Sequence, residues 1–331
     1  MIVSYDTIIY MEKPPFQINS KILTLVSEIQ ETLGELKSAT LVKPSVKLRK
    51  ENKIRTIHSS LAIEGNSLNE QQMTAILNNE RVLGPKQQIT EVQNALRLYD
   101  GINKLNPLKE KDLLKAHGLL MQDLIEKPGK YRSTAVGIFK GDKLSKFSPP
   151  AKQVSGLMAN LFKFLGHDKE VHLLLKACIF HYELEFIHPF ADGNGRIGRL
   201  WQQLILMQHS EIFEYISVES LIYKRQKDYY KALEASDKAG DSTPFIEFSL
   251  KMISESLFEF KNDFSPMRPT GRDRLKVAID HFGTKSFSRK DYLNLHKGLS
   301  TATASRDLAK AVEEKIVRAE GDKATAKYKK Y

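Results

Sequence analysis

The stretch HPFADGNGRIGR, residues 188–199, combines a histidine, a proline, three glycines and two arginines. Such a mixture suits neither a core helix nor a core strand. The glycines let main-chain N–H groups point at a bound oxyanion, and RIGRLWQQLILM has the pattern of a helix, whose N-terminus carries partial positive charge. Arg196 and Arg199 are three residues apart and can lie on the same side. The stretch therefore predicts a polyphosphate site at the start of a helix.

Two other residues of this stretch suit chemistry on a phosphate. Asp192 directly precedes the glycines, where a carboxylate can hold a Mg²⁺ ion that bridges phosphate oxygens. A neutral imidazole at His188 could take the proton of an attacking hydroxyl. The simpler alternative is a polar turn in which His188 and Asp192 serve as helix caps, but the order of the whole set favours the anion site.

The spacing G-x-G-x-x-G over 193–198 also matches a dinucleotide-binding fingerprint, with Glu214 about 20 residues further on. That fingerprint requires a strand immediately before it and alternating strand–helix units around it. The preceding residues 171–187, VHLLLKACIFHYELEFI, have a helical pattern instead. We therefore reject a dinucleotide-binding domain.

Charge and composition restrict the class of protein. The chain has 331 residues and a formal net charge of +11, which favours anionic partners such as nucleotides, nucleic acid or an acidic protein face. Its one cysteine, Cys178, excludes an internal disulfide and is expected to be a buried packing residue. No apolar run reaches the roughly 18–20 residues that a membrane helix needs, and no signal peptide is evident. We expect a cytoplasmic protein with no membrane contact.

Helical spacing of apolar residues dominates the chain as far as residue 262 and predicts a mainly α-helical fold. Residues 129–150 differ, because they alternate around Val136 and Ile138, with a turn at Gly141-Asp142, as is typical of a β-hairpin. The predicted helices cover residues 19–39, 45–65, 69–79, 89–103, 109–125, 151–166, 171–187, 199–210, 220–240 and 242–260.

A domain boundary is predicted near NDFSPMRPTGRD, residues 262–273, which is rich in proline, glycine and polar residues. From Arg268 onward there are sixteen Lys and Arg against eight Asp and Glu. Three helical patterns and two short strands predict a small winged helix-turn-helix domain at 268–331. Its predicted elements are helices at 273–283, 288–298 and 300–316 and a hairpin within 317–331.

A winged helix suggests DNA contact, because its second helix and wing would place cations near phosphates. The residues at the exposed start of that helix are Ser300, Thr301, Thr303, Ser305 and Arg306, and those on the wing are Lys323, Lys327, Lys329 and Lys330. The alternatives are a docking module for protein contacts and a solvated basic face, since a fold does not fix a function.

HPFADGNGRIGR resembles the signature of Fic-domain proteins, His-x-Phe-x-(Asp/Glu)-Gly-Asn-Gly-Arg-x-x-Arg, with every specified position filled. The surrounding pattern resembles a Fic catalytic core at 111–262 with an N-terminal helical region at 1–110. Fic proteins typically transfer AMP from ATP to a Ser, Thr or Tyr hydroxyl of a protein and release pyrophosphate. The resemblance therefore implies a nucleotidyltransferase that uses ATP with Mg²⁺ or Mn²⁺ and modifies a protein target, including itself.

The same resemblance implies a role for each position of the motif. His188 is the general base, Phe190 anchors the loop in the core, and Asp192 coordinates the metal. The phosphate-binding positions are Gly193, Asn194 and Gly195 for the α- and β-phosphates, Arg196 for the β-phosphate region and Arg199 for the γ-phosphate.

Two further segments resemble Fic elements. The segment GKYRSTAVGIFKGD, 129–142, resembles the flap that aligns a target segment by strand pairing, although an ordinary surface hairpin would have the same pattern. Its target-docking positions are Thr134, Val136, Gly137 and Ile138. Tyr229 and Tyr230 resemble an aromatic pair near the nucleoside, and helix packing is the equal alternative.

The segment SLAIEGN, 60–66, resembles the inhibitory motif (Ser/Thr)-x-x-x-Glu-(Gly/Asn) of the family. The resemblance implies that Glu64 pairs with Arg199 and occupies the group that the γ-phosphate needs, with Ser60 holding the motif in place. Without the resemblance, Glu64 before Gly65 reads as an ordinary helix end.

We interpret the chain as a protein adenylyltransferase of Fic type, self-inhibited through an N-terminal helix and extended by a winged-helix domain. Two alternatives stay open. One is a DNA-binding regulator whose Fic-like core senses nucleotide, and the other is a phosphodiesterase that removes AMP, with Glu64 directing a water. The sequence fixes neither the target nor the oligomeric state, and the resemblance offers a homodimer as one alternative.

Overall fold

The computed structural model describes residues 13–39, 46–134, 137–140, 143–263, 270–321 and 326–331. The chain divides into two compact units. The larger unit comprises Met1–Leu33 and Ser45–Asn262, and the smaller comprises Gly34–Pro44 and Asp263–Tyr331.

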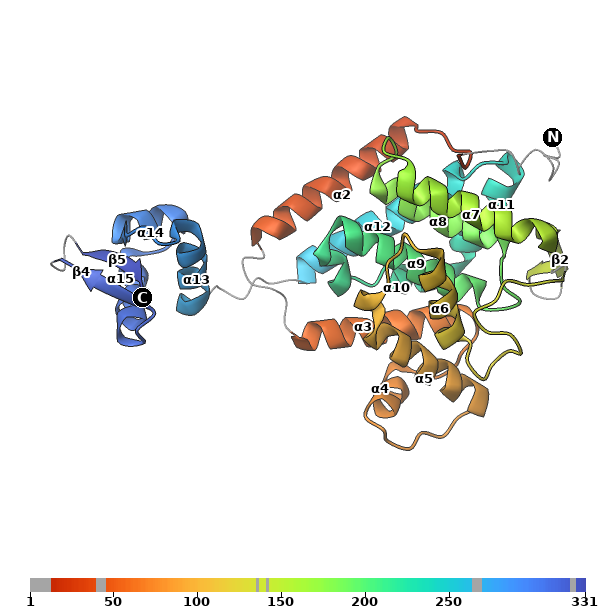
Figure 1. The fold of residues 1–331 in the computed structure, drawn as a ribbon, viewed down its shortest axis with the longest axis horizontal. Coiled ribbons are helices and arrows are strands. Elements are labelled where there is room, and N and C mark those ends of the chain that lie inside the picture. The colour runs from red at the N-terminus through yellow and green to blue at the C-terminus, as the bar shows by residue number, and fades with distance from the viewer. Residues whose placement is uncertain (1–12, 40–45, 135–136, 141–142, 264–269, 322–325) are drawn as a thin grey trace. The chain divides into compact units, whose positions relative to one another are not determined.

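The larger unit is almost entirely helical, as the apolar spacing predicts (Figure 1). Its α-helices and the two short 3₁₀ helices η1 and η2 are connected by short loops. These elements are α2 (Ser20–Ala39), α3 (Val46–Ile63), α4 (Glu70–Leu77), α5 (Lys86–Asp100), η1 (Ile102–Lys104), α6 (Glu110–Leu120), α7 (Ala151–His167), α8 (Leu173–Ile187), α9 (Asn194–His209), η2 (Glu211–Tyr215), α10 (Val218–Lys224), α11 (Gln226–Ala239) and α12 (Thr243–Asp263).

Helices α8 and α9 form the centre of this unit and pack extensively against each other. Helix α8 is apolar on nearly every side, which is why most of it is buried. Phe180 of α8 and Trp201 of α9 are fully buried, as is Cys178. Each large apolar side chain buried in this way contributes about 1.5–3 kcal/mol to folding. A well-packed apolar core therefore adjoins the loop at 188–193, which connects α8 and α9.

Two left-handed residues bracket that loop. His188 ends α8 with a φ of 49°, and Gly193 precedes α9 with a φ of 84°. Glycine adopts this region without strain, whereas for histidine it is uncommon. We call residues 188–193 the motif loop. The conformation at His188 must be held by its surroundings, which the site below explains.

The helix predicted over 199–210 begins earlier, at Asn194, and two other predicted helices are divided or shortened in the structure. The single helix predicted over 220–240 is two helices, α10 and α11, separated at Arg225, whose φ of −117° and ψ of 34° leave the helical region. The Arg225 guanidinium pairs with Glu255 of α12 at 2.6 Å. The helix predicted over 109–125 ends at Leu120, because Met121 leaves the helical region with a φ of −104° and a ψ of 11°, and Asp123 beyond it is left-handed. Apolar periodicity continues across both breaks and so does not reveal them.

The hairpin predicted at 129–150 is present as strands β1 (Gly137–Lys140) and β2 (Lys143–Phe147). They pair antiparallel, with Gly137 opposite Phe147 and an irregularity after Ile138. Among the described residues β1 pairs only with β2. Val136 and the expected turn at Gly141-Asp142 lie outside the described residues.

From Thr270 onward, the described residues of the smaller unit form three helices and a three-stranded antiparallel sheet (Figure 1, blue). Its strand β3 was not predicted, because two residues are too few to show a strand pattern. Phe287 of β3 pairs with Tyr328 of β5 and packs in a core with Tyr292, Leu308 and Val317. The elements are α13 (Gly271–Phe282), β3 (Phe287–Ser288), α14 (Arg289–Leu295), α15 (Thr301–Glu313), β4 (Val317–Glu320) and β5 (Lys327–Lys330), with the sheet order β3-β5-β4.

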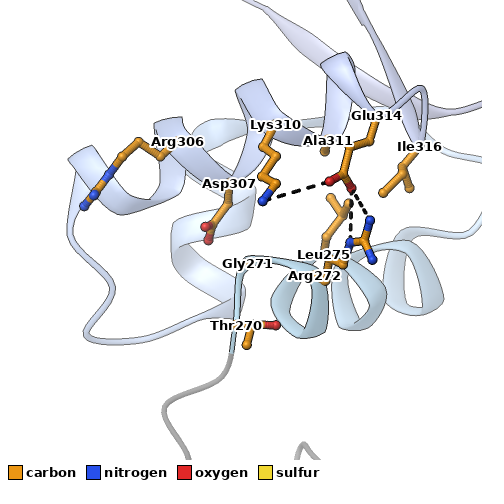
Figure 2. Close-up of a pocket in the computed structure, with 10 residues that line it drawn as sticks. All are labelled: Thr270, Gly271, Arg272, Leu275, Arg306, Asp307, Lys310, Ala311, Glu314 and Ile316. Carbon is orange, nitrogen blue, oxygen red and sulfur yellow. Dashed lines mark hydrogen bonds and ion pairs between the residues drawn. The ribbon is translucent and has the colours of Figure 1, made fainter.

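A pocket of about 500 Å³ lies between α13 and α15 of this unit (Figure 2). Most of its charged side chains are already paired with side chains of opposite charge. Arg272 contacts Glu314 at 3.1 Å, and Lys310 approaches the same carboxylate at 4.0 Å. Asp307 is held by Arg274 at 2.7 Å. Apart from the Arg306 guanidinium, which has no carboxylate partner among the described residues, the pocket presents little uncompensated charge to a ligand.

Candidate active site

The start of α9 is shaped by Asn194, which is buried. Its side-chain Oδ1 accepts from the Phe190 N–H at 2.9 Å, and its Nδ2 donates to the Phe190 carbonyl at 3.0 Å. Phe190 is fully buried, so this pair of bonds fastens the motif loop to the core. Because the amide of Asn194 is engaged in this way, the groups that can face an anion here are the backbone N–H groups of the first turn of α9.

His117 of α6 supports the motif loop from below. Its ring stacks on Phe190, with centroids 3.6 Å apart and planes 7° apart. Nδ1 accepts from the Gly129 N–H at 2.9 Å, so Nε2 carries the proton and donates to the Asp192 carbonyl at 2.9 Å. Burial lowers the pKa of His117 to about 4, which keeps the ring neutral and able to make both bonds.

Arg132 holds the left-handed turn at His188. Its Nε donates to the His188 carbonyl at 2.7 Å, and Nη2 donates to the carbonyls of Ile187 at 3.2 Å and Pro149 at 2.6 Å. Nη1 donates to the Thr134 carbonyl at 3.0 Å. One buried guanidinium thus joins both ends of the hairpin segment to the end of α8.

The backbone of the same residue adds a further tie, since the Arg132 N–H donates to the Pro189 carbonyl at 2.9 Å. Burial lowers the pKa of Arg132. The His188 ring is half-buried, and its Nδ1 atom lies away from solvent.

Arg199 is fully buried and binds the end of α3. Its Nε donates to Ser60 Oγ at 3.1 Å, and its Nη2 donates to the Ser60 carbonyl at 3.0 Å and to Glu64 Oε1 at 2.7 Å. The Glu64 carboxylate also lies directly over α9, since a Cβ placed on Gly195 would be 2.5 Å from Glu64 Oε1. Glu64 therefore occupies the position where an anion would meet the first turn of α9.

Arg196 lies beside it and is also paired with carboxylates. Its Nη2 contacts both Asp192 oxygens at 3.2 Å, and its Nη1 is 3.5 Å from Oε1 of Glu91 on α5. The Asp192 side chain is 59% exposed, whereas those of Arg196 and Glu91 are 7% and 15% exposed. Both arginines of the motif are thus neutralised by acidic side chains of the same chain.

Asp192 is the residue that could hold a metal ion. No cluster of three or more metal-ligating side chains occurs among the residues that the structure describes. Mg²⁺ in phosphate-transfer sites needs only one or two carboxylates, because the substrate phosphates supply other ligands. The exposed carboxylate of Asp192, beside the start of α9, fits that pattern.

The remaining predicted residues lie in or near this region. Tyr229 is buried, and its hydroxyl is 3.1 Å from Nε2 of His181, while Tyr230 is 37% exposed. The charge of Glu64 contributes to the raised pKa of Tyr230, after burial. Contact of either ring with a nucleoside remains a prediction. Thr134 is exposed, and Gly137 and Ile138 lie in β1.

The sequence reasoning missed three side chains of the site: His117, Arg132 and Glu91. None belongs to a motif, and each acts on the motif loop or its arginines from another element. Only Arg132 could have been singled out from the sequence, because it lies near the start of the predicted hairpin segment, in GKYRS.

Within the described ranges no helix is long and apolar enough to span a membrane.

Comparisons with known proteins agree with the geometry of the site. Residues 107–206, which include the motif loop, match the Fic/DOC family. The Protein adenylyltransferase Fic of Nematostella vectensis is 27% identical over 82% of this chain and 63% of its own length. The Protein adenylyltransferase fic-1 of Caenorhabditis briggsae is 27% identical over 72% and 47%. The chain thus spans less than two thirds of the length of these curated relatives.

A solved structure is similar over nearly the whole chain. The Fic family protein from Desulfovibrio desulfuricans G20 is 39% identical, with a TM-score of 0.71, and the match covers 96% of this chain and 98% of that one. On the strength of this similarity and of a site built around the motif loop, the chain belongs to the Fic family.

Proposed function

We propose that the chain is a protein adenylyltransferase that moves AMP from ATP to a hydroxyl of a protein and is held inactive by Glu64. The names of the curated relatives support the reaction, and the complete motif at 188–199 supports the site. The observation that carries the proposal is the position of the Glu64 carboxylate. It lies against Gly195 at the start of α9, bonded to Arg199, where a phosphate would otherwise bind.

In the proposed reaction the target hydroxyl oxygen attacks the α-phosphorus of ATP. A bond forms between that oxygen and the phosphorus, the bond from the α-phosphorus to the bridging oxygen breaks, and pyrophosphate leaves. His188 takes the hydroxyl proton. Because its Nδ1 lies away from solvent, Nε2 is the nitrogen that would accept it. Such a transfer depends mainly on positioning and on stabilisation of spread negative charge.

The first turn of α9 and the two arginines supply that stabilisation. The N–H groups of Gly195 and its neighbours would face the α- and β-phosphates, and Arg199, released from Glu64, would take the γ-phosphate. Asp192 would hold a Mg²⁺ or Mn²⁺ ion, which neutralises phosphate charge when bound. Glu64 competes because it supplies a carboxylate to the same guanidinium at 2.7 Å.

The hairpin would align the target. Among the described residues β1 has one paired edge, and a strand of the target could pair with the other. Arg132 fixes the hairpin segment to His188 through carbonyls on both sides. The same guanidinium would therefore set the distance between a docked hydroxyl and the base.

The test is mass spectrometry of the Glu64→Gly protein after incubation with ATP and Mg²⁺. An added adenylate group is expected on the chain itself, and His188→Ala in the same background should abolish it without loss of nucleotide binding. If Glu64→Gly carries no more adenylate than the parent, the inhibition is refuted. Release of AMP from a modified target by the parent protein would instead support the phosphodiesterase alternative.

We also propose that the smaller unit is a winged helix that contacts DNA. Its element order supports this, as do three exposed cations: Lys297 between α14 and α15, Arg306 on α15 and Lys327 on β5. Lys323 lies outside the described residues. A gel-shift with random duplex at low and moderate salt tests the proposal, and the absence of any shift at low salt would exclude it.

A further inference from the structure

Glu91 contacts two parts of the site at once. Its Oε1 is 3.5 Å from Nη1 of Arg196, and its Oε2 accepts from Nδ2 of Asn66 at 2.8 Å. Asn66 comes two residues after Glu64, at the point where the chain leaves α3. A single carboxylate on α5 therefore bridges an arginine of the motif and the segment that carries Glu64.

Each end of this bridge is enclosed. Asn66 is buried, and besides Glu91 it donates to the Gln88 carbonyl at 3.1 Å. Its Oδ1 accepts from the Leu68 N–H at 3.1 Å, which shapes the turn after Glu64. The side chain of Arg196 is also buried. Charge-assisted bonds that are enclosed in this way are stronger than pairs exposed to water.

Arg196 keeps an unused donor. Its Nε is buried and has no hydrogen-bond partner in the part of the chain that the structure describes. A buried donor without an acceptor is costly, so the guanidinium gains by turning to a new acceptor such as a phosphate oxygen. Because the Arg196 contact with Glu91 is long, at 3.5 Å, that turn would break it first.

We propose that Glu91 is a positioning residue. It couples the binding of a phosphate at Arg196 to the strength of the contact between Glu64 and Arg199. This inference rests on the proposed function, in which Arg196 contacts the β-phosphate region. When a phosphate binds Arg196, Glu91 loses its cationic partner. The hydrogen bond between Glu91 and Asn66, which orders the chain after Glu64, then weakens. The carboxylate of Glu64 then leaves Arg199 more readily.

Two substitutions cut the bridge at opposite ends. Glu91→Gln retains an acceptor for Asn66 but presents an uncharged amide to Arg196. Asn66→Ala leaves the Glu91–Arg196 pair and removes the tie to the segment. Glu80→Gln is the matched control, since this exposed carboxylate lies between α4 and α5 and contacts neither Arg196 nor Asn66 in the contacts described for it.

The measurement is hydrogen exchange of the amides of residues 64–68 with and without ADP and Mg²⁺. ADP has a β-phosphate for Arg196 but no γ-phosphate for Arg199. Its effect therefore tests phosphate binding at Arg196 alone. In the parent protein and in Glu80→Gln, ADP should accelerate exchange about threefold or more, whereas in Glu91→Gln and Asn66→Ala it should have little effect. Glu91→Gln should also bind ADP about threefold to tenfold more tightly, because a competing carboxylate is gone.

Three outcomes overturn the coupling: no effect of ADP on the parent, an unchanged ADP response in Glu91→Gln, or an unchanged response in Asn66→Ala. Thermal unfolding shows whether Glu91→Gln and Asn66→Ala fold. If one of them does not fold, the other still tests the coupling against the parent protein. The exchange measurement involves no catalysis. A Glu64→Gly protein that carries no adenylate would therefore refute the proposed function while leaving the coupling to be judged by exchange.

Discussion

The carboxylate of Glu64 lies over Gly195, so closely that a Cβ added at Gly195 would be 2.5 Å from Glu64 Oε1 and 3.0 Å from Arg199 Nη1. The acidic side chain that directly follows α3 thus rests on the first turn of α9, where the absence of a side chain at Gly195 makes room for it. The same space is what a phosphate group would need. The contact therefore leaves no room for a side chain at position 195, and it is the contact on which the proposed inhibition depends.

Gly195→Ala should close this space. Alanine favours a helix over glycine by about 1 kcal/mol, so the fold itself should tolerate the change. In the Glu64→Gly background, where the carboxylate is absent, the added methyl group should weaken ATP binding at least about tenfold because it takes the phosphate position. Isothermal titration calorimetry measures this, and unchanged affinity would show that the phosphates bind elsewhere.

Ser60→Ala should release Glu64 only in part. The substitution removes the acceptor of Arg199 Nε, but the Ser60 carbonyl and Glu64 remain. A buried donor without its acceptor should lower the free energy of unfolding by about 1–3 kcal/mol, measured by urea denaturation. Adenylate transfer should rise above that of the parent yet stay below that of Glu64→Gly. Activity equal to that of Glu64→Gly would show that Ser60, not the carboxylate, is the main restraint.

Lowering the pH should reduce the free energy of unfolding, in part because of His117. Its pKa is about 4 in the folded chain, below the value of an unfolded histidine, so the folded state favours the neutral ring. The resulting stability is fully present above the unfolded pKa of about 6.5 and is lost as the pH falls towards 4, by about 3 kcal/mol. His117→Gln should show a shallower fall of the unfolding free energy over this range. An identical pH dependence in the two proteins would contradict this role of His117. The other histidines, including buried His181, are present in both proteins and cannot cause a difference between them.

Arg132→Lys should reduce AMP transfer while leaving ATP binding nearly unchanged. A lysine cannot donate to four carbonyls at once, so the hairpin segment and His188 lose their common anchor. In the Glu64→Gly background we expect ATP affinity within about twofold of the unsubstituted protein and transfer reduced about tenfold or more. The matched control is Arg225→Lys, at an arginine whose pairing with Glu255 is partly exposed. An equal loss in the control would mean a general effect on folding.

Much of this site could be predicted because its chemistry is local in sequence. The residues 188–199 form one loop and one helix turn, so their order alone indicates backbone amides and guanidinium groups around an anion. The mainly helical fold followed from apolar spacing, since periodicity is a direct consequence of burying one side of a helix. Burial of Cys178 was likewise expected from its apolar neighbours and is confirmed.

The supporting residues could not be predicted, because their partners are distant in sequence. Arg132 binds carbonyls up to 56 residues away, and His117 contacts the carbonyl of Asp192, 75 residues further on. A carbonyl is present at every residue, so nothing in the sequence marks which ones an arginine will bind. The break at Arg225 was missed for a related reason: the helical spacing continues through it, and its guanidinium pairs with Glu255 in another helix.

The pairing of both motif arginines with acidic side chains has a consequence for how fast a nucleotide arrives. Two guanidinium groups face three carboxylates, those of Glu64, Glu91 and Asp192, so the charges of the site itself do not add up to a positive patch even though the whole chain carries +11. Diffusional encounter with ATP should then be slow and depend little on ionic strength. Removing Glu64 removes the local excess of negative charge, so ATP should associate faster with the Glu64→Gly protein than with the parent, and this gain should shrink as salt is added.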